Sequence, residues 1–384
     1  MTEYSKDKEI KDNEWKYEQP VKIICGRGAI RELPEAISLI GGNIGLLISG
    51  KHLWRGDDGE RIKGLCNGKI AAVFSDVSVN PLLDEVEKAA ELAKENSVDF
   101  IIAVGGGSVI DCAKAVSVAA ATENSFKDMY YSGKFPEAGI PLIAVPTTSG
   151  TGSEVTAVSV ISDNKTGIKK PISCKSFYPA YALSDSALTD SMPPKVIAET
   201  GIDAIAHALE AYWSINHQPI CDMFAIKSLK LALAWLEKSY FEHGNKEAKD
   251  NMAQAALLAG MAFNLPKTTV CHACSFPLTN IYGISHGEAV GLTLDYFLRV
   301  NAHGKETERL IILSKELGFK DVDQFADRIA DLKNRLNLRT DLKEFDIDEK
   351  KLVQLVKESQ HPNILGNPVK VTEQMLYNMY KGFI

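Results

Sequence analysis

Three histidines and one aspartate are the side chains of this sequence best suited to chemistry. Asp203 and His207, in the run GIDAIAHALE, are four residues apart, so on a helix they share one face. His272 and His286 follow much later, in the runs VCHACS and ISHGEA. One carboxylate and three imidazoles suit a divalent ion such as Fe²⁺ or Zn²⁺, and we therefore predict a metal site. The alternative is a set of structural histidines with a plain i, i+4 hydrogen bond.

Two further features surround these candidate ligands. Glu210 lies one turn beyond His207 on the same predicted helix face, where it would either orient a ligand or be a simple surface charge. Cys271 and Cys274 flank His272 in a C-x-x-C pattern, but a zinc knuckle requires a second pair that the sequence lacks. We therefore interpret the two cysteines as small buried residues.

A glycine-rich turn, Gly105-Gly106-Gly107-Ser108, follows the apolar run VDFIIAV. Glycines let a backbone approach a pyrophosphate closely, and a helix that starts here offers free N–H groups to it. Ser108 and Asp111 also fit a capping box at that helix start. The pattern is GGGSxxD rather than GxGxxG, so a plain tight turn remains an alternative to a phosphate site.

A second polar loop, PTTSGTGSE, follows the apolar run GIPLIAV. It places the hydroxyls of Thr147, Thr148, Ser149 and Thr151 around two glycines. In parallel sheets, ligands bind beyond the carboxyl ends of the strands, and two such loops at neighbouring strand ends favour a nucleotide site. A nucleotide site combined with a metal site predicts metal-assisted hydride transfer.

The elements that must position these residues change character near the middle of the chain. In the first half, apolar runs at 43–50, 69–77, 98–107 and 139–148 alternate with helical patterns such as 81–97, which predicts a parallel sheet covered by helices. After the run MPP at 192–194 the pattern is helical, with helices expected at 195–213, 221–239, 247–263, 267–279, 286–302, 305–317, 321–335 and 348–358. We predict an α/β dinucleotide-binding domain over 1–190 and a helical metal-binding domain over 191–384, with the site in the cleft between them.

Composition limits the partners of this protein. Its 384 residues are 45% hydrophobic and 24% charged, as in soluble globular proteins, and the net charge of −7 gives no support for nucleic-acid binding. No apolar run reaches the roughly 20 residues that span a bilayer, and the polar N-terminus is unlike a secretory signal. Seven scattered cysteines favour a reducing compartment. We expect a cytoplasmic homo-oligomer, a dimer, acting on a small molecule without membrane or nucleic acid.

Five motifs in a specific order resemble one known family. VGGGSVIDCAK, PTTSGTGSE, DSMPP, TGIDAIAHALE and HAC…SHGEA together are similar to the iron-containing (group III) alcohol dehydrogenases, and the resemblance runs from PVKIICGRGAI to the last helices. It implies the dehydroquinate synthase-like fold of that family, an α/β nucleotide domain followed by a helical domain. It places the metal ligands at Asp203, His207, His272 and His286. It places nucleotide contacts at Gly106, Gly107, Ser108, Asp111, Thr147, Thr148, Thr151, Thr156 and Lys169.

The resemblance also bears on the cofactors. It implies Fe²⁺, with Zn²⁺ as the alternative, because both accept these ligands. Family members that prefer NAD carry an acidic residue after the second strand, and the corresponding residue here is Gly50. A glycine leaves space for a 2′-phosphate, which Lys51 would neutralise. We therefore predict NADP(H) over NAD(H), the alternative being that Gly50 is only a turn and both cofactors bind.

Two departures from the family concern the substrate. Many members carry a further histidine four residues after the third ligand, where this chain has Phe276, so no side chain is assigned as general acid. Lys267, Thr268 and Thr269 lie about one turn before His272 and offer a cation and two hydroxyls to an anionic group. The pattern is similar to the branch that reduces phosphonoacetaldehyde to 2-hydroxyethylphosphonate. The alternative is a broad small-aldehyde reductase of the butanol type, with Lys267 in solvent.

Two other classes of function are alternatives to a dehydrogenase, and the sequence supports neither. A lyase of the dehydroquinate synthase type has a different metal set, two histidines and a glutamate, which the Asp203-containing set does not match. A non-enzymatic nucleotide sensor would have no need of a Lewis acid beside its ligand.

Overall fold

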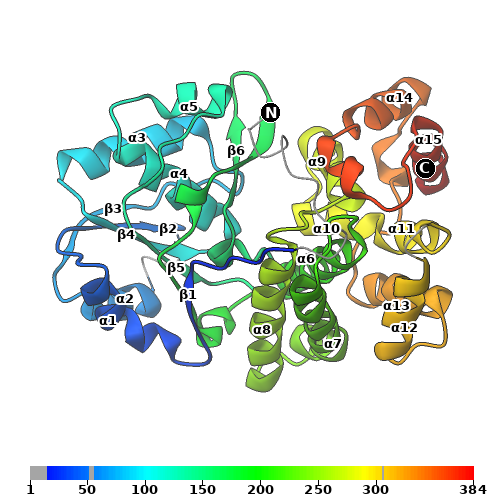
Figure 1. Cartoon of the computed structure of the whole chain (residues 1–384), viewed down its shortest axis with the longest axis horizontal. Helices are drawn as coiled ribbons and strands as arrows, with labels where there is room; N and C mark the ends of the chain where they lie inside the picture. Colours follow the sequence, from blue (N-terminus) through cyan, green and yellow to red (C-terminus); the bar gives the residue numbers. More distant parts are fainter. Residues whose placement is uncertain (1–14, 52–55, 305–306) are drawn as a thin grey trace.

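The four strands predicted from apolar runs lie side by side in one parallel sheet (Figure 1). The structure is a computed structural model that describes residues 15–51, 56–304 and 307–384. The sheet has six strands in the order β1-β8-β5-β4-β2-β3, and β1 and β8 are the two that the apolar pattern did not single out. Its strands are β1 (Lys22–Cys25), β2 (Gly45–Ser49), β3 (Ile70–Phe74), β4 (Phe100–Gly105), β5 (Leu142–Pro146) and β8 (Tyr181–Ser184).

Helices cover both faces of this sheet because its central strands are buried on both sides. β2, β4 and β5 are fully buried, as is typical of parallel strands between two helical layers. The helices of this half are α1 (Leu33–Leu39), α2 (Asp57–Leu65), α3 (Leu83–Glu95), α4 (Gly107–Ala120) and α5 (Phe126–Ser132). A hairpin of β6 (Val158–Asp163) and β7 (Ile168–Ser173) follows the loop after β5. The predicted α/β fold is confirmed.

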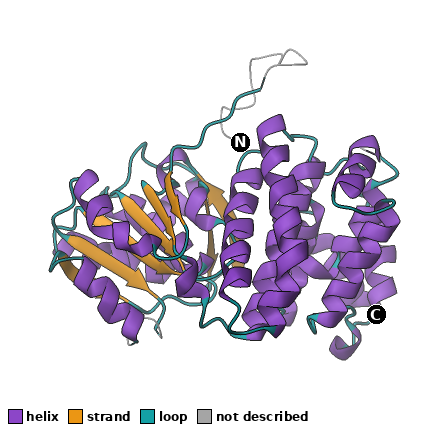
Figure 2. Ribbon diagram, turned by 90° about the horizontal axis from the view of Figure 1, so that it is seen from below, coloured by secondary structure: helices purple, strands orange, loops and turns teal. Residues whose placement is uncertain are grey.

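The second half is helical, as predicted, and stands beside the sheet (Figure 2). Its helices are α6 (Pro194–Trp213), α7 (Pro219–Phe241), α8 (Lys246–Phe263), α9 (Val270–Tyr282), α10 (His286–Leu292), α11 (Leu294–Asn301), α12 (Thr307–Glu316), α13 (Val322–Arg335), α14 (Glu349–Glu358) and α15 (Glu373–Phe383). The domain boundary placed at residue 190 stays a prediction. It falls between the end of a 3₁₀ turn at Thr189 and the start of α6 at Pro194.

Two helix predictions need correction, and one helix was not predicted. The helix expected at 267–279 begins at Val270, because Lys267 has a φ of 65° and cannot belong to a right-handed helix. The helix expected at 286–302 is two helices that meet at Thr293. The sequence patterns also did not indicate α15. Of the helix expected at 305–317, residues 305 and 306 lie outside the described residues.

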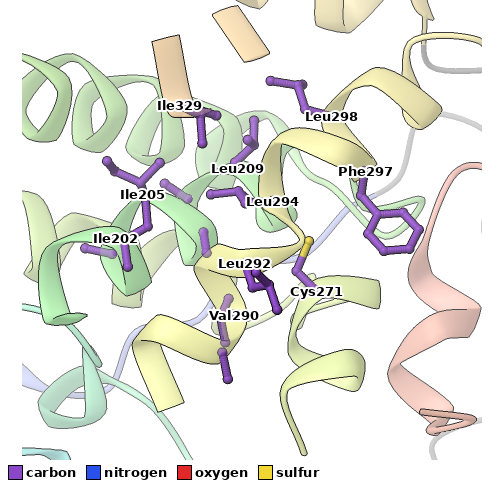
Figure 3. Packing of buried hydrophobic residues seen from close by; sticks show 14 of the residues in the cluster. Ile202, Ile205, Leu209, Cys271, Val290, Leu292, Leu294, Phe297, Leu298 and Ile329 are labelled. Atoms are coloured by element: carbon purple, nitrogen blue, oxygen red, sulfur yellow. The ribbon is translucent and has the colours of Figure 1, made fainter. Parts of the chain in front are cut away.

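The core of the helical half holds the candidate ligands in place. Figure 3 shows Ile202, Ile205 and Leu209 of α6 packed with Val290 and Leu292 of α10. Cys271 also lies in this core, and neither it nor Cys274 is accessible to solvent, which confirms that both are small buried residues. Within the described residues, none of the helices combines the length and the apolarity needed to cross a lipid bilayer.

Candidate metal and nucleotide site

Three of the predicted metal ligands form one buried cluster between α6 and α9. Asp203 and His207 lie one turn apart on α6, and His272 enters from the first turn of α9. Ligand atoms of these three residues all lie within 4.8 Å of one another. The Nε2 atoms of His207 and His272 are 3.0 Å apart, and Nε2 of His272 is 3.6 Å from Oδ1 of Asp203. Tetrahedral coordination at ordinary bond lengths separates neighbouring ligand atoms by about 3.4 Å, so this spacing suits a bound ion.

His286 completes the set from the first residue of α10. Its Nε2 lies 3.9 Å from Oδ1 of Asp203, and its ring centre is 5.4 Å from that of His272. α10 reaches this position because residue 287 is a glycine. A Cβ at Gly287 would lie 2.0 Å from the carbonyl oxygen of Glu199 on α6. With 37% of its side chain exposed, His286 is the member of the set on the open side of the cluster.

The residues present fit a divalent ion. Oδ1 of Asp203 is buried and has no hydrogen-bond partner in the described part of the chain, an arrangement that costs free energy unless another group satisfies it. Burial lowers the pKa of His207 to about 4 and that of His286 to about 3, so both imidazoles are neutral, the form that binds metals. Burial opposes ionisation of Asp203, but the charge that the nearby imidazoles carry when protonated, with His207 first, and the hydrogen bond from His272 outweigh it and lower the pKa of Asp203.

Glu210 orients His272, which confirms one of the two interpretations of this residue. The carboxylate is fully buried, and its Oε2 pairs with Nδ1 of His272. Its Oε1 accepts hydrogen bonds from the backbone N–H of Thr269 at 3.1 Å and of Cys271 at 2.8 Å. With Nδ1 held in this way, the other ring nitrogen of His272 faces Asp203 and His207.

The glycine turn begins α4, but the predicted capping box is wrong. Gly105 ends β4, and Gly106 is the N-cap of α4 without a side-chain cap. The Ser108 hydroxyl instead donates to the carbonyl of Val79, which belongs to the chain after β3. Asp111 accepts hydrogen bonds from the hydroxyl of Ser153 and from the backbone of Val160. Both side chains therefore bond to other segments, and the first N–H groups of α4 receive no side-chain cap.

The second polar loop connects the glycine turn to the helical half. The N–H of Thr147 donates to the carbonyl of Gly105 at 3.0 Å, so the loops after β4 and β5 lie side by side. Gly152 has a φ of 58°, and a Cβ there would lie 2.4 Å from the Cα of Gly260 on α8. This contact, which only a glycine allows, places the predicted nucleotide loop, including Thr148 and Thr151, beside the metal-ligand domain.

Lys114 supports this loop through hydrogen bonds, a role that the motifs in the sequence did not predict. The side chain is completely buried on α4, and its Nζ donates to the Ser153 hydroxyl at 2.8 Å, to the Thr156 hydroxyl at 3.3 Å and to the Val158 carbonyl at 2.7 Å. Burial lowers its pKa to about 8, although Asp111 opposes the shift. The signal in the sequence was a lysine within an otherwise apolar helix, which burial permits only with partners.

The other predicted nucleotide contacts lie around the same edge of the sheet. Thr156 is 1% exposed and bonds to Lys114, so its hydroxyl is engaged within the protein. Lys169, on β7, donates to the side chain of Asn80 at 2.9 Å. Gly50 directly follows β2, and a Cβ on it would meet no atom within 4 Å. These nucleotide contacts stay predictions.

The three residues predicted to hold an anion, Lys267, Thr268 and Thr269, have different surroundings in the structure. Lys267 is exposed, and its Nζ donates to the carbonyl of Asn264 at 2.7 Å. The Thr268 hydroxyl accepts from the side chain of Asn363 at 2.9 Å. Thr269 is fully buried, and its hydroxyl donates to Glu210 and accepts from the indole of Trp213. The expectation that Thr269 contacts a substrate is therefore wrong, because the helix starts only at Val270 and turns this hydroxyl inward.

Comparison with known proteins gives one consistent result. Residues 20–186 match the model of the iron-containing alcohol dehydrogenases, and residues 197–384 match its C-terminal counterpart. The structure superposes on sulfoacetaldehyde reductase from Bifidobacterium kashiwanohense, solved with NAD⁺, with a TM-score of 0.94 and 44% identity over 96% of this chain and 98% of the other. NADPH-dependent butanol dehydrogenase from Clostridium saccharobutylicum is 34% identical over 88% of this chain and 89% of its own. Sulfoacetaldehyde reductase from Bilophila wadsworthia is 31% identical over 86% and 88%.

Proposed function

Because this chain belongs to the iron-containing alcohol dehydrogenase family, we propose that it reduces a short aldehyde bearing an anionic head group, with a divalent metal and a nicotinamide cofactor. The family are oxidoreductases that act on the CH–OH group with NAD(P). Sulfoacetaldehyde is the first substrate candidate, since two similar proteins are named for it. Phosphonoacetaldehyde is the second, because a phosphonate presents the same kind of anionic oxygens to a cation.

In this proposal Asp203, His207, His272 and His286 hold the metal, with Fe²⁺ as the expected ion and Zn²⁺ as the alternative. A bound divalent ion supplies Lewis-acid polarisation of the carbonyl group. Glu210 fixes the ring of His272 for this purpose. The loops after β4 and β5 would hold the nicotinamide cofactor beside the cluster, and this cofactor would supply the hydride for the carbonyl carbon.

The choice of an anionic substrate depends mainly on the positive charge of Lys267. The residue lies at the surface, and no carboxylate of the described residues forms an ion pair with its ammonium. Removal of water by surrounding atoms lowers its pKa. It also lies close enough to Lys114, beneath the second polar loop, to lower the pKa of that residue. A similar protein, choline dehydrogenase from Bacillus subtilis, is named for a cationic substrate, which an unpaired lysine would repel.

Replacing Lys267 with methionine tests this choice. We expect KM for sulfoacetaldehyde to rise about 10- to 100-fold, because a hydrogen-bonded charge pair is lost, while kcat changes little. KM for propanal, which is neutral and similar in size, should stay within about twofold. Steady-state kinetics with sulfoacetaldehyde, phosphonoacetaldehyde and propanal measure the difference. If the unmodified enzyme used propanal as well as either anionic aldehyde, the protein would be a general aldehyde reductase.

Gly50 supports a preference for NADP(H). The residue follows the carboxyl end of β2, and a Cβ on it would meet no atom within 4 Å. Lys51 is 65% exposed, and its 3.4 Å ion pair with Asp76, which is 75% exposed, is worth little, so a 2′-phosphate can compete for the lysine. Because the similar proteins include both an NADPH-dependent enzyme and one solved with NAD⁺, the proposal rests on this local geometry.

The substitution Gly50→Asp should reverse this preference. We expect KM for NADPH to rise at least about 10-fold, because a carboxylate would face the 2′-phosphate, while KM for NADH should fall or stay unchanged. The ratio of kcat/KM for the two cofactors, measured with one aldehyde, is the readout. Gly64→Asp, on α2 and also without a close neighbour, serves as the control. A Gly50→Asp ratio equal to that of the unmodified enzyme would show that this position does not select the cofactor.

A further inference from the structure

A histidine from near the C-terminus lies against α9 just beyond the metal cluster. His361 precedes the 3₁₀ helix η8 (Pro362–Gly366), which packs on α9 and is drawn red-orange beside it in Figure 1. The ring centre of His361 is 4.7 Å from that of Phe276, with the two planes tilted by 52°. In sequence these rings are 85 residues apart, since 361 − 276 = 85, so only the fold brings them together.

Phe276 marks the side of α9 on which a substrate would lie. It is one helical turn after His272, so both side chains project from the same face of the helix. Residues 270–275 and Pro277 and Leu278 are buried, whereas Phe276 is partly exposed. Phe276 is therefore the side chain of the first two turns of α9 that solvent reaches. His361 is itself partly exposed and lies against Phe276.

The hydrogen bonds of His361 determine its chemistry. Its Nδ1 accepts from the backbone N–H of Asn363 at 3.2 Å, so in the neutral ring the proton resides on Nε2. Among the described residues no hydrogen bond engages Nε2, so its N–H remains available as a donor. Burial also lowers the pKa of His361, which keeps the ring neutral at neutral pH.

The segment that carries His361 is tied to the segment that carries Lys267. The side chain of Asn363 donates to the Thr268 hydroxyl at 2.9 Å, next to Lys267 in sequence. The N–H of Ile215, just after α6, donates to the carbonyl of Gly366 at 3.0 Å. The turn from His361 to Asn363 thus contacts Phe276 within α9 and Thr268 just before it.

We propose that Nε2–H of His361 donates a hydrogen bond to the head group of the substrate and is a specificity-determining contact of this enzyme. The proposal rests on the proposed function, because it requires an acceptor such as a sulfonate on the carbon next to the aldehyde. Lys267 supplies a charge to that head group and His361 supplies a directed neutral donor. A neutral aldehyde of the same length offers His361 no acceptor.

The test compares two substitutions at this position. His361→Phe keeps a ring against Phe276 and removes the donor, whereas His361→Gln restores a donor on a shorter planar group. For His361→Phe we expect KM for sulfoacetaldehyde to rise about 10-fold, the usual effect of losing a hydrogen bond to a charged group, while KM for propanal stays within about twofold. His361→Gln should recover part of the loss. Metal content should match the unmodified enzyme in both variants. The thermal midpoint of His361→Phe should fall only slightly, because that variant also loses the hydrogen bond from the Asn363 N–H to Nδ1.

The outcomes separate this inference from the proposed function. If the unmodified enzyme prefers sulfoacetaldehyde and Lys267→Met weakens that preference, but His361→Phe leaves both KM values unchanged, the role of His361 is overturned and the proposed function stands. Equal rises in KM for both aldehydes would likewise overturn it, since they would indicate only a packing role for the ring. If the unmodified enzyme shows no preference for an anionic aldehyde, the proposed substrate and the role of His361 fail together.

Discussion

Replacing His272 with alanine is expected to abolish turnover while leaving cofactor binding intact. His272 contributes one of the three buried ligand atoms within 4.8 Å of each other and contacts both other members. Loss of a Lewis acid removes several kcal/mol of stabilisation, so we expect kcat to fall on the order of 1000-fold. The nucleotide loops come from the other half of the chain, and the Kd for NADPH should therefore change less than about threefold.

Three measurements define this result: bound metal by elemental analysis, kcat with the aldehyde, and Kd for NADPH by fluorescence titration. His303→Ala is the matched control, because His303 is exposed after α11 and has no part in the cluster. It should retain metal and activity. A His272→Ala protein that kept its turnover would contradict the metal mechanism, and one that lost both metal and cofactor binding would indicate that the two sites are not independent.

Replacing Glu210 with glutamine is expected to weaken metal binding without removing any ligand. In the native protein one carboxylate oxygen accepts three hydrogen bonds, from the N–H groups of Thr269 and Cys271 and from the Thr269 hydroxyl. If the glutamine oxygen keeps those bonds, its NH₂ group faces Nδ1 of His272 and moves the ring proton to Nε2. A protonated Nε2 has no lone pair for a metal, so affinity should fall about 10- to 100-fold.

This effect can be separated from loss of fold by titrating the metal. Competition with a chelator gives the affinity, and kcat measured at saturating metal should recover much of the native value, because all four ligands remain. Glu308→Gln, an exposed position on α12, is the control and should leave metal affinity unchanged. Unchanged affinity in Glu210→Gln would show that the contact to His272 does not determine its ring orientation. Low activity even at saturating metal would point instead to a distorted site.

Local patterns were sufficient for much of the fold and for the choice of metal ligands. The i, i+4 relation of Asp203 and His207 is a property of helix geometry, and it is present wherever α6 packs. The buried strands at β2, β4 and β5 and the turn into α4 are likewise local, because apolar runs and glycines act within a few residues. Helix boundaries were less accurate. The positive φ of Lys267 delays α9, and it results from the packing of that turn.

The sequence by itself determined the residue types, the family and the kind of chemistry. The tertiary structure decided which side chains bond to or pack against one another. Nothing in the spacing indicates that Glu210 bonds to His272, that Lys114 supports the loop at Ser153, or that Thr269 turns inward. The contact of His361 with Phe276 is equally invisible in the sequence. These pairs are separated by tens of residues, and their meeting depends on how whole helices pack into one core, which no local periodicity encodes.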